Sequence, residues 1–272
     1  MLENKTAAIY GGGAVGGAVA RAFADAGARV YLAGRSTARL EKIASDIGGA
    51  AGVAEVDALD ERAVAAHADT VARDAGGIDV VLNAVSFPFV HDTPFAELTV
   101  EEIMHPIDAF LRTNLITAKS VARHMTARGS GTILTLSAGA SQVAPPGSLG
   151  YGTACAAIET MSQRLAVELG PSGVRVVCLR PHLIADGPAN GSYTSELFER
   201  RAAAAGVSVE QWIERWQKNV TLLGRLPTLA RVADAAVFLA SDRAAATTGA
   251  VVDLTSGNAV RNHASALVAV LH

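Results

Sequence analysis

Short runs of apolar residues alternate along the chain with Ala-rich stretches in which apolar positions recur at helical spacing. The runs are nearly continuous in apolar residues, which is typical of parallel strands covered by helices on both faces. Strand and helix in this alternation predict βαβ units and an α/β fold, a Rossmann-type doubly wound parallel sheet. The predicted strands cover residues 6–10, 29–33, 52–56, 78–83, 131–137, 174–179 and 251–254, and the first predicted helices cover residues 16–26, 39–47 and the stretch from the third strand to about residue 74.

Composition narrows the class of protein further. The chain has 272 residues, with 23 Lys and Arg against 26 Asp and Glu, and this balance argues against nucleic acid as a partner. Two cysteines make neither a disulfide framework nor a zinc site, so we expect a cytoplasmic protein without a metal. The sequence shows no signal peptide, no internal repeat and no Ser/Gly linker, and we expect one domain over residues 1–258.

Residues 129–158 carry no formal charge and are long enough to span a bilayer. About half of them are Gly, Pro, Ser or Thr, which break helices and leave polar groups that lipid cannot satisfy. We therefore expect no membrane span, and we interpret this run as the dry wall of an active site.

A glycine cluster between the first predicted strand and helix reads Gly11-Gly12-Gly13-Ala14-Val15-Gly16, which fits G-x-G-x-x-G. Glycines at these positions let the backbone approach a pyrophosphate, and the N-terminus of the helix supplies partial positive charge. Because the motif lies between a strand and a helix, it predicts a dinucleotide site; the alternative is a tight turn without a ligand.

The end of the second strand indicates which dinucleotide binds. An NAD site places a carboxylate there for the ribose hydroxyls, whereas this chain has Gly34-Arg35-Ser36. A guanidinium pairs with a 2′-phosphate, so NADP(H) is preferred over NAD(H), unless Arg35 is only a solvated loop residue. Asp57, after the third strand, is placed to contact the adenine or to form an ordinary turn.

With these residues in view, the chain resembles the short-chain dehydrogenase/reductase family over about residues 4–190 and 225–257. The resemblance rests on the glycine motif, on motifs around Asn83 and Asn114, on Ser137 after the fifth strand and Tyr151 fourteen residues later, and on a late stretch that ends with Asp253. In full, the matching segments are Ile9 to Gly17, Leu82-Asn83-Ala84-Val85, Arg112-Thr113-Asn114-Leu115, and Ala240-Ser241-Asp242 with Thr248-Gly249.

The resemblance implies roles for these residues. Tyr151 would give a proton to the substrate carbonyl while hydride arrives from the nicotinamide, Ser137 would steady the oxyanion, and Asn114 would support a water-mediated proton path. The spacing from Ser137 to Tyr151 is one residue longer than usual, which leaves Ser141 as a second candidate for the serine. It also implies cofactor contacts from Gly11, Gly13, Val15, Gly16, Arg35, Ser36, Asp57, Asn83, Ala84 and Pro181.

The departures from the family pattern matter as much as the matches. The family has a lysine four residues after the tyrosine, which lowers the tyrosine pKa by its charge, and this chain has Cys155 there. Without that cation, Tyr151 keeps a pKa nearer the ordinary value of about 10. A tyrosine that stays protonated suits reduction better than oxidation. An activated acceptor such as an enone or an iminium would need less help from an acid. Val15, Val85 and His182 also depart from the pattern.

Further segments are expected to shape the pocket and the assembly. We expect Pro106 to restart the helix that carries Asn114. Residues 187–225, with Trp212 and Trp216 on one helix face, are expected to form a substrate lid, unless the tryptophan pair belongs to the core or to a subunit contact. His182 is either an acid, base or substrate contact or a structural histidine. The apolar tail, residues 259–272, is expected to pack on its own or a neighbouring subunit, and the resemblance implies a homodimer or homotetramer.

These observations predict an NADPH-dependent reductase of a carbonyl, enone or imine on a small, largely apolar metabolite. Two other functions stay open because of the missing lysine and the altered glycine motif: a non-redox catalyst (isomerase, dehydratase or cyclase), and a nucleotide-binding pseudoenzyme. The sequence does not name the substrate.

Overall fold

The computed structural model describes residues 1–49, 52–143, 147–192 and 194–260. Within them, seven strands form one parallel sheet in the order β3-β2-β1-β4-β5-β6-β7. The strands are β1 (Thr6–Tyr10), β2 (Arg29–Gly34), β3 (Gly52–Glu55), β4 (Val80–Asn83), β5 (Gly131–Leu136), β6 (Val174–Pro181) and β7 (Val251–Leu254). The predicted fold and each predicted strand are confirmed, with ends that differ by up to two residues.

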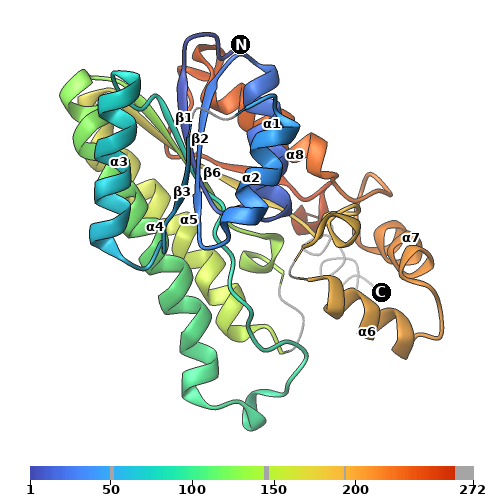
Figure 1. Ribbon diagram of the computed structural model, residues 1–272. Coiled ribbons are helices and arrows are strands. Elements are labelled where there is room, and N and C mark those ends of the chain that lie inside the picture. Colours follow the sequence, from blue (N-terminus) through green and yellow to red (C-terminus); the bar gives the residue numbers. More distant parts are fainter. Residues whose placement is uncertain (50–51, 144–146, 193, 261–272) are drawn as a thin grey trace.

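Helices cover both faces of the sheet (Figure 1). On one side lie α1 (Ala14–Asp25), α2 (Thr37–Asp46) and α8 (Leu229–Ala240), and on the other α3 (Glu61–Ala75), α4 (Val100–Arg128) and α5 (Leu149–Leu169). Two further helices, α6 (Ser195–Ala204) and α7 (Val209–Val220), stand apart from the sheet. The strand order reverses direction between β1 and β4, and this switch point is where open α/β sheets bind ligands.

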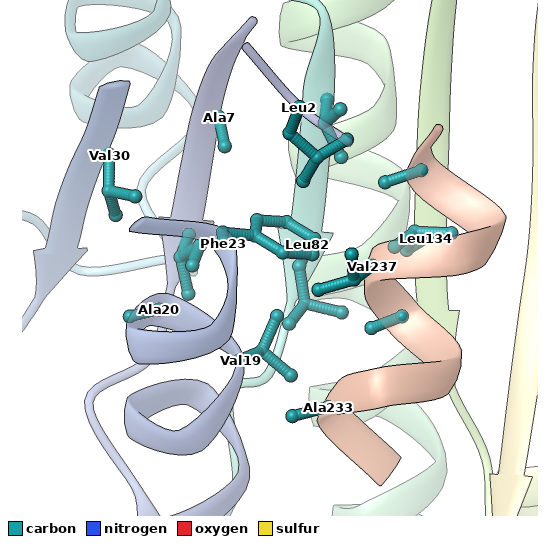
Figure 2. Packing of buried hydrophobic residues seen from close by; sticks show 14 of the residues in the cluster. Leu2, Ala7, Val19, Ala20, Phe23, Val30, Leu82, Leu134, Ala233 and Val237 are labelled. Atoms are coloured by element: carbon teal, nitrogen blue, oxygen red, sulfur yellow. The ribbon is translucent and has the colours of Figure 1, made fainter. Parts of the chain in front are cut away.

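A continuous apolar layer joins α1 and α8 to the sheet. In Figure 2, Val19 and Phe23 of α1 point toward Leu82 of β4 and Val237 of α8. Phe23 is fully buried, and burying such a side chain stabilises the fold by about 1.5–3 kcal/mol. The layer fixes the start of α1 against the ends of β1 and β4, where the glycine cluster lies.

The expectation that Pro106 restarts a helix is wrong, because α4 runs without a break from Val100 to Arg128. A capping box between Thr99 and Glu102 satisfies amides at its start, so the helix is established before the proline. The Pro106 ring is buried beside Gly150 of α5, where any side chain would collide with α4. This close packing offsets the hydrogen bond that proline cannot make.

In the described part of the chain, no helix is both long enough and apolar enough to cross a membrane. The uncharged run forms β5, a 3-10 turn at Gly139–Ser141 and the first half of α5. The expectation for the tail lies outside the described residues from position 261 onward.

Candidate active site

The glycines in the turn from β1 into α1 have different structural roles. Gly11 has φ +107°, and a Cβ there would lie 2.5 Å from the carbonyl oxygen of Ala84. A Cβ at Gly16 would overlap the carbonyl oxygen of Gly11. By contrast, a Cβ at Gly13 would meet nothing within 4 Å. Gly11 and Gly16 therefore let the backbone pack on itself, whereas Gly13 keeps space open above the turn.

Helix α1 begins directly after this open space. Its N-cap is Gly13, and no side chain caps its first amides, which leaves them available to an anion. The open space and the uncapped amides fit a pyrophosphate, so the residues present can hold a dinucleotide.

Two cavities meet at this turn. The smaller cavity has a volume of about 160 Å³ and is lined by Gly11, Arg35, Ser36 and Asp57. The larger cavity has a volume of about 540 Å³ and extends away from the turn toward Tyr151. Both are lined by Gly13, Arg39, Ala84, Val85 and Ser86, so they form one continuous groove. The larger cavity is also lined by Val15, Asn83, Asn114, Ser137, Tyr151 and Pro181. The structure thus brings the sequence-predicted residues together, except Gly16, which lines neither cavity.

The smaller cavity carries exposed positive charge. Arg35 lies at the end of β2 with its guanidinium 5.9 Å from the centre of the Phe87 ring, and Arg39 follows one helical turn later on α2. Asp57 accepts a hydrogen bond from the amide of Leu59 at 3.0 Å, and it also lines this cavity. Sequence reasoning missed Arg39, although its spacing of four residues from Arg35 places both on one side of the turn into α2.

Asn83 holds the loop that follows β4. Its amide nitrogen donates to Thr117 of α4 at 3.1 Å, and its side-chain oxygen accepts from the amide of Val85 at 3.1 Å. These bonds fix Ala84 beside Gly11, at the boundary of the two cavities. Asn83 therefore shapes the groove through its backbone neighbours.

Tyr151 sits in the first turn of α5 within an aromatic cluster. Its ring stacks on Phe89 with 4.3 Å between ring centres, and the ring of Phe110 lies 5.8 Å away. Cys155 lies one turn later on α5 and lines the same cavity as Tyr151. Burial raises the pKa of the Cys155 thiol to about 12, so the thiol is neutral where the family pattern has a cation.

Ser137 follows β5 and is bonded to a buried carboxylate. Its hydroxyl donates to Oε1 of Glu159 at 2.8 Å, and Ser141 donates to the same oxygen at 2.5 Å. Arg180 of β6 pairs with the other carboxylate oxygen of Glu159 at 3.1 Å and with Asp253 at 3.3 Å. The two candidate serines are therefore joined through one acid, and of the two Ser137 lines the larger cavity.

Sequence reasoning missed Glu159 and Arg180. A signal for Glu159 was present, because it stands four residues after Cys155 and eight after Tyr151, on the buried face of α5. An acid on such a face needs a partner, and β6 supplies it.

Asn114 of α4 is buried in the cavity wall with 4% of its surface exposed. Its amide nitrogen donates to the carbonyl of Phe110 at 2.9 Å, while its side-chain oxygen has no hydrogen-bond partner among the described residues. That oxygen is a buried acceptor whose hydrogen-bonding capacity is unused among the described residues.

The predicted lid segment lies against the cavity. Trp212 and Trp216 stack on one face of α7, with ring centres 5.6 Å apart. Trp216 and His182 both line the larger cavity, and their rings lie 4.9 Å apart. Burial lowers the pKa of His182 to about 4, so this ring is neutral near pH 7.

Comparisons with known proteins agree with this architecture. A protein-family model described as Enoyl-(Acyl carrier protein) reductase matches residues 12–258. The 3-oxoacyl-[acyl-carrier-protein] reductase FabG of Chlamydia muridarum is 29% identical over 95% of this chain and 99% of its own length. Galactitol 2-dehydrogenase (L-tagatose-forming) of Cereibacter sphaeroides is 30% identical over 95% and 96% of the two chains.

A crystal structure of NAD+-bound xylitol dehydrogenase superposes with a TM-score of 0.82 at 21% identity, covering 94% of this chain and 99% of the other, and shows the fold. The chain belongs to the short-chain dehydrogenase/reductase family, and the relatives named above are reductases and dehydrogenases. The family uses a nicotinamide dinucleotide, NAD or NADP, and the groove described above fits such a cofactor.

Proposed function

We propose that this protein is an NADPH-dependent reductase of a carbonyl, enone or imine on a small, largely apolar metabolite, with Tyr151 as the proton donor. The observation that carries the proposal is the continuous groove. It joins a cationic end, at Arg35, to an end where Asn114, Ser137 and Tyr151 share one wall.

The preference for NADPH over NADH rests on the end of β2. Arg35 and Arg39 place two guanidinium groups on the smaller cavity, and Ser36 adds a hydroxyl. A 2′-phosphate would pair with these groups, whereas the acid that would hold two free ribose hydroxyls is absent from the end of β2. Gly11, Gly13, Val15, Asn83, Ala84 and Pro181 would line the rest of the cofactor, with Asp57 near the adenine and Gly16 keeping the turn tight.

When bound, NADPH supplies the hydride for the reaction. Tyr151 then donates its phenolic proton to the substrate oxygen as negative charge develops there. The neutral Cys155 thiol does not help Tyr151 to release that proton as a cation would. A donor that stays protonated serves reduction, while oxidation of an alcohol needs a base, so reduction is the favoured direction.

The neutral Cys155 thiol also supports two other candidate functions. A non-redox isomerase, dehydratase or cyclase, or a nucleotide-binding pseudoenzyme, would not need an activated tyrosine. Either would keep the groove and bind the dinucleotide without consuming it.

We also propose an oligomeric assembly and the limits of the domain. Apolar side chains of α4 and α5 are exposed on the chain, among them Leu115, Leu149 and Val167, which supports a homodimer or homotetramer. We propose one domain over residues 1–258 with a lid near 187–225, a small molecule as the partner, and a cytoplasmic location.

Hydride tracing tests the proposed function. Protein is mixed with NADPH that is deuterated at the transferable position, together with a pool of ketones, enones and cyclic imines, and products are analysed by mass spectrometry. A product with one deuterium, lost in Tyr151→Phe for the ketone substrates, is the expected result. Binding of NADPH without label in any product contradicts the reductase and favours the non-redox functions.

A further inference from the structure

The hydrogen of the Ser137 hydroxyl points away from the cavity. It is donated to Glu159 at 2.8 Å, and that acid is held in place by its ion pair with Arg180. A serine hydroxyl has one hydrogen and two lone pairs, so Ser137 presents lone pairs to whatever lies in the cavity. In this arrangement Ser137 accepts hydrogen bonds and does not donate one to an oxyanion.

Asn114 of α4 also has a hydrogen-bond acceptor, and not a donor, left without a partner. Its hydrogen-bonded amide nitrogen faces the Phe110 carbonyl, and its unpartnered oxygen is buried in the wall of the same cavity. A ligand that offers a hydrogen satisfies Ser137, whereas a carbonyl oxygen does not, and the unpartnered Asn114 oxygen places a second acceptor in the wall and no donor.

The charged groups near this end of the groove carry an excess of negative charge, which favours a cation. Glu159, Arg180 and Asp253 together carry one net negative charge, and the neighbouring Cys155 is neutral. At the rim, Arg201 is neutralised by two hydrogen bonds to Asp92. Glu196 lines the same cavity and forms no ion pair with the residues that the structure describes, while Arg39 lines it only where it meets the smaller cavity, at the end proposed for the cofactor phosphate.

Aromatic rings complete the wall. Phe110, Tyr151 and Trp216 line the cavity, and the faces of such rings attract cations, with Trp the strongest. An apolar, aromatic surface with acceptors and excess negative charge suits a small organic cation that carries an N–H group.

We propose that the substrate is an imine in its protonated, iminium form. This inference rests on the proposed function and narrows its substrate class. Reduction forms a C–H bond at the iminium carbon, the electrons of the C=N π bond become a lone pair on nitrogen, and NADPH is oxidised to NADP+. The nitrogen already carries its proton, so the donor role proposed for Tyr151 applies to a carbonyl substrate, and reduction of the iminium needs neither that proton nor a lysine to activate Tyr151.

A matched pair of unreactive ligands tests the charge preference without turnover. Protonated 1,2,3,4-tetrahydroisoquinoline and neutral isochroman have the same shape and differ at one ring atom. Calorimetry with the NADPH-bound protein at pH 7 is expected to show the amine binding at least about tenfold more tightly. Equal binding, or tighter binding of isochroman, would overturn the inference.

Variants locate the origin of the preference. Ser137→Ala removes the acceptor and Glu159→Gln removes the charge, and each is expected to reduce the preference to less than about threefold. Ser141→Ala is the matched control, because it loses a hydrogen bond to the same carboxylate without lining the cavity, and it should keep the preference. A preference that survives in Ser137→Ala, which leaves the Glu159–Arg180 pair intact, would overturn the role assigned to Ser137.

The same samples separate this inference from the proposed function. Deuterium transfer to 1-tetralone, with equal binding of the two unreactive ligands, supports the reductase and overturns the iminium substrate. Failure to bind NADPH contradicts the reductase, and the substrate inference falls with it. Deuterium transfer to 3,4-dihydroisoquinoline that exceeds transfer to 1-tetralone supports both.

Discussion

Cys155 follows Tyr151 by one helical turn on α5, and both residues line the larger cavity, with Cys155 as a neutral, buried group. The position after the proposed proton donor is therefore occupied by a residue that cannot change its charge near pH 7. The chemistry proposed for the site follows from that arrangement.

Cys155→Lys is expected to raise kcat/KM for simple ketones by about tenfold or more, because an ammonium group beside Tyr151 lowers the pKa of the phenol. Steady-state kinetics across a pH series measures this, and the alkaline limb should move to lower pH. Cys155→Ala, which removes the thiol without adding charge, is the control and should not move that limb. An unchanged ketone rate in a folded lysine variant would count against the proposal that the missing cation limits the reaction.

Two glycines of the β1–α1 turn should respond differently to alanine. Gly13→Ala is expected to keep its melting temperature and to weaken NADPH binding about tenfold, since the new methyl group enters the open space where the cofactor would lie. Gly16→Ala should instead cost about 1–3 kcal/mol of stability, because its methyl group overlaps the Gly11 carbonyl. Thermal unfolding and fluorescence titration separate the two effects, and a Gly13 variant that binds NADPH normally would place the cofactor elsewhere.

Removal of the cationic end of the groove should change the choice of cofactor. Arg35→Ala and Arg39→Ala are each expected to weaken NADPH binding by about tenfold while leaving NADH affinity within about twofold, because only NADPH carries the 2′-phosphate. Lys42→Ala removes an exposed charge from α2 that lines neither cavity, and it serves as the control. Equal losses for both cofactors would contradict a phosphate contact.

Acid should destabilise this protein through buried histidines. Burial lowers the pKa of His67 from its ordinary 6.5 to about 4, and its ring nitrogen hydrogen-bonds the Tyr10 hydroxyl at 2.9 Å. Between these two pH values the unfolded chain takes up a proton that the folded chain does not, so stability present above pH 6.5 is lost as the pH falls toward 4.

Urea unfolding at a series of pH values measures this slope. His67→Gln keeps a partner for Tyr10 without the titration, and it is expected to make the slope between pH 6.5 and 4 less steep, with the remainder due to His182. His105→Gln, at an exposed position, should leave the slope as it is. A slope that is the same in all three proteins would show that His67 does not titrate on unfolding.

The strands and the glycine turn could be predicted from residues that are close together in the sequence. The continuous apolar runs predict the strands, and glycines at 11, 13 and 16 between a strand and a helix predict the cofactor turn, because both signals are local in the chain. The helix spacing of Trp212 and Trp216 likewise predicts the stack that α7 shows. The error at Pro106 has the same origin, since local propensity alone does not include the packing of Gly150 on α4.

The tertiary structure decided which groups of the site donate hydrogen bonds and which accept them. The sequence supplies Ser137 and a position for it, but the direction of its hydrogen depends on Glu159, which α5 brings within 2.8 Å. That acid can be buried as an anion only because Arg180, on a strand beside β5, pairs with it. A hydroxyl donates toward the strongest acceptor in reach, and which acceptor is in reach is set by how helix and sheet pack, not by the residues next to it in the chain.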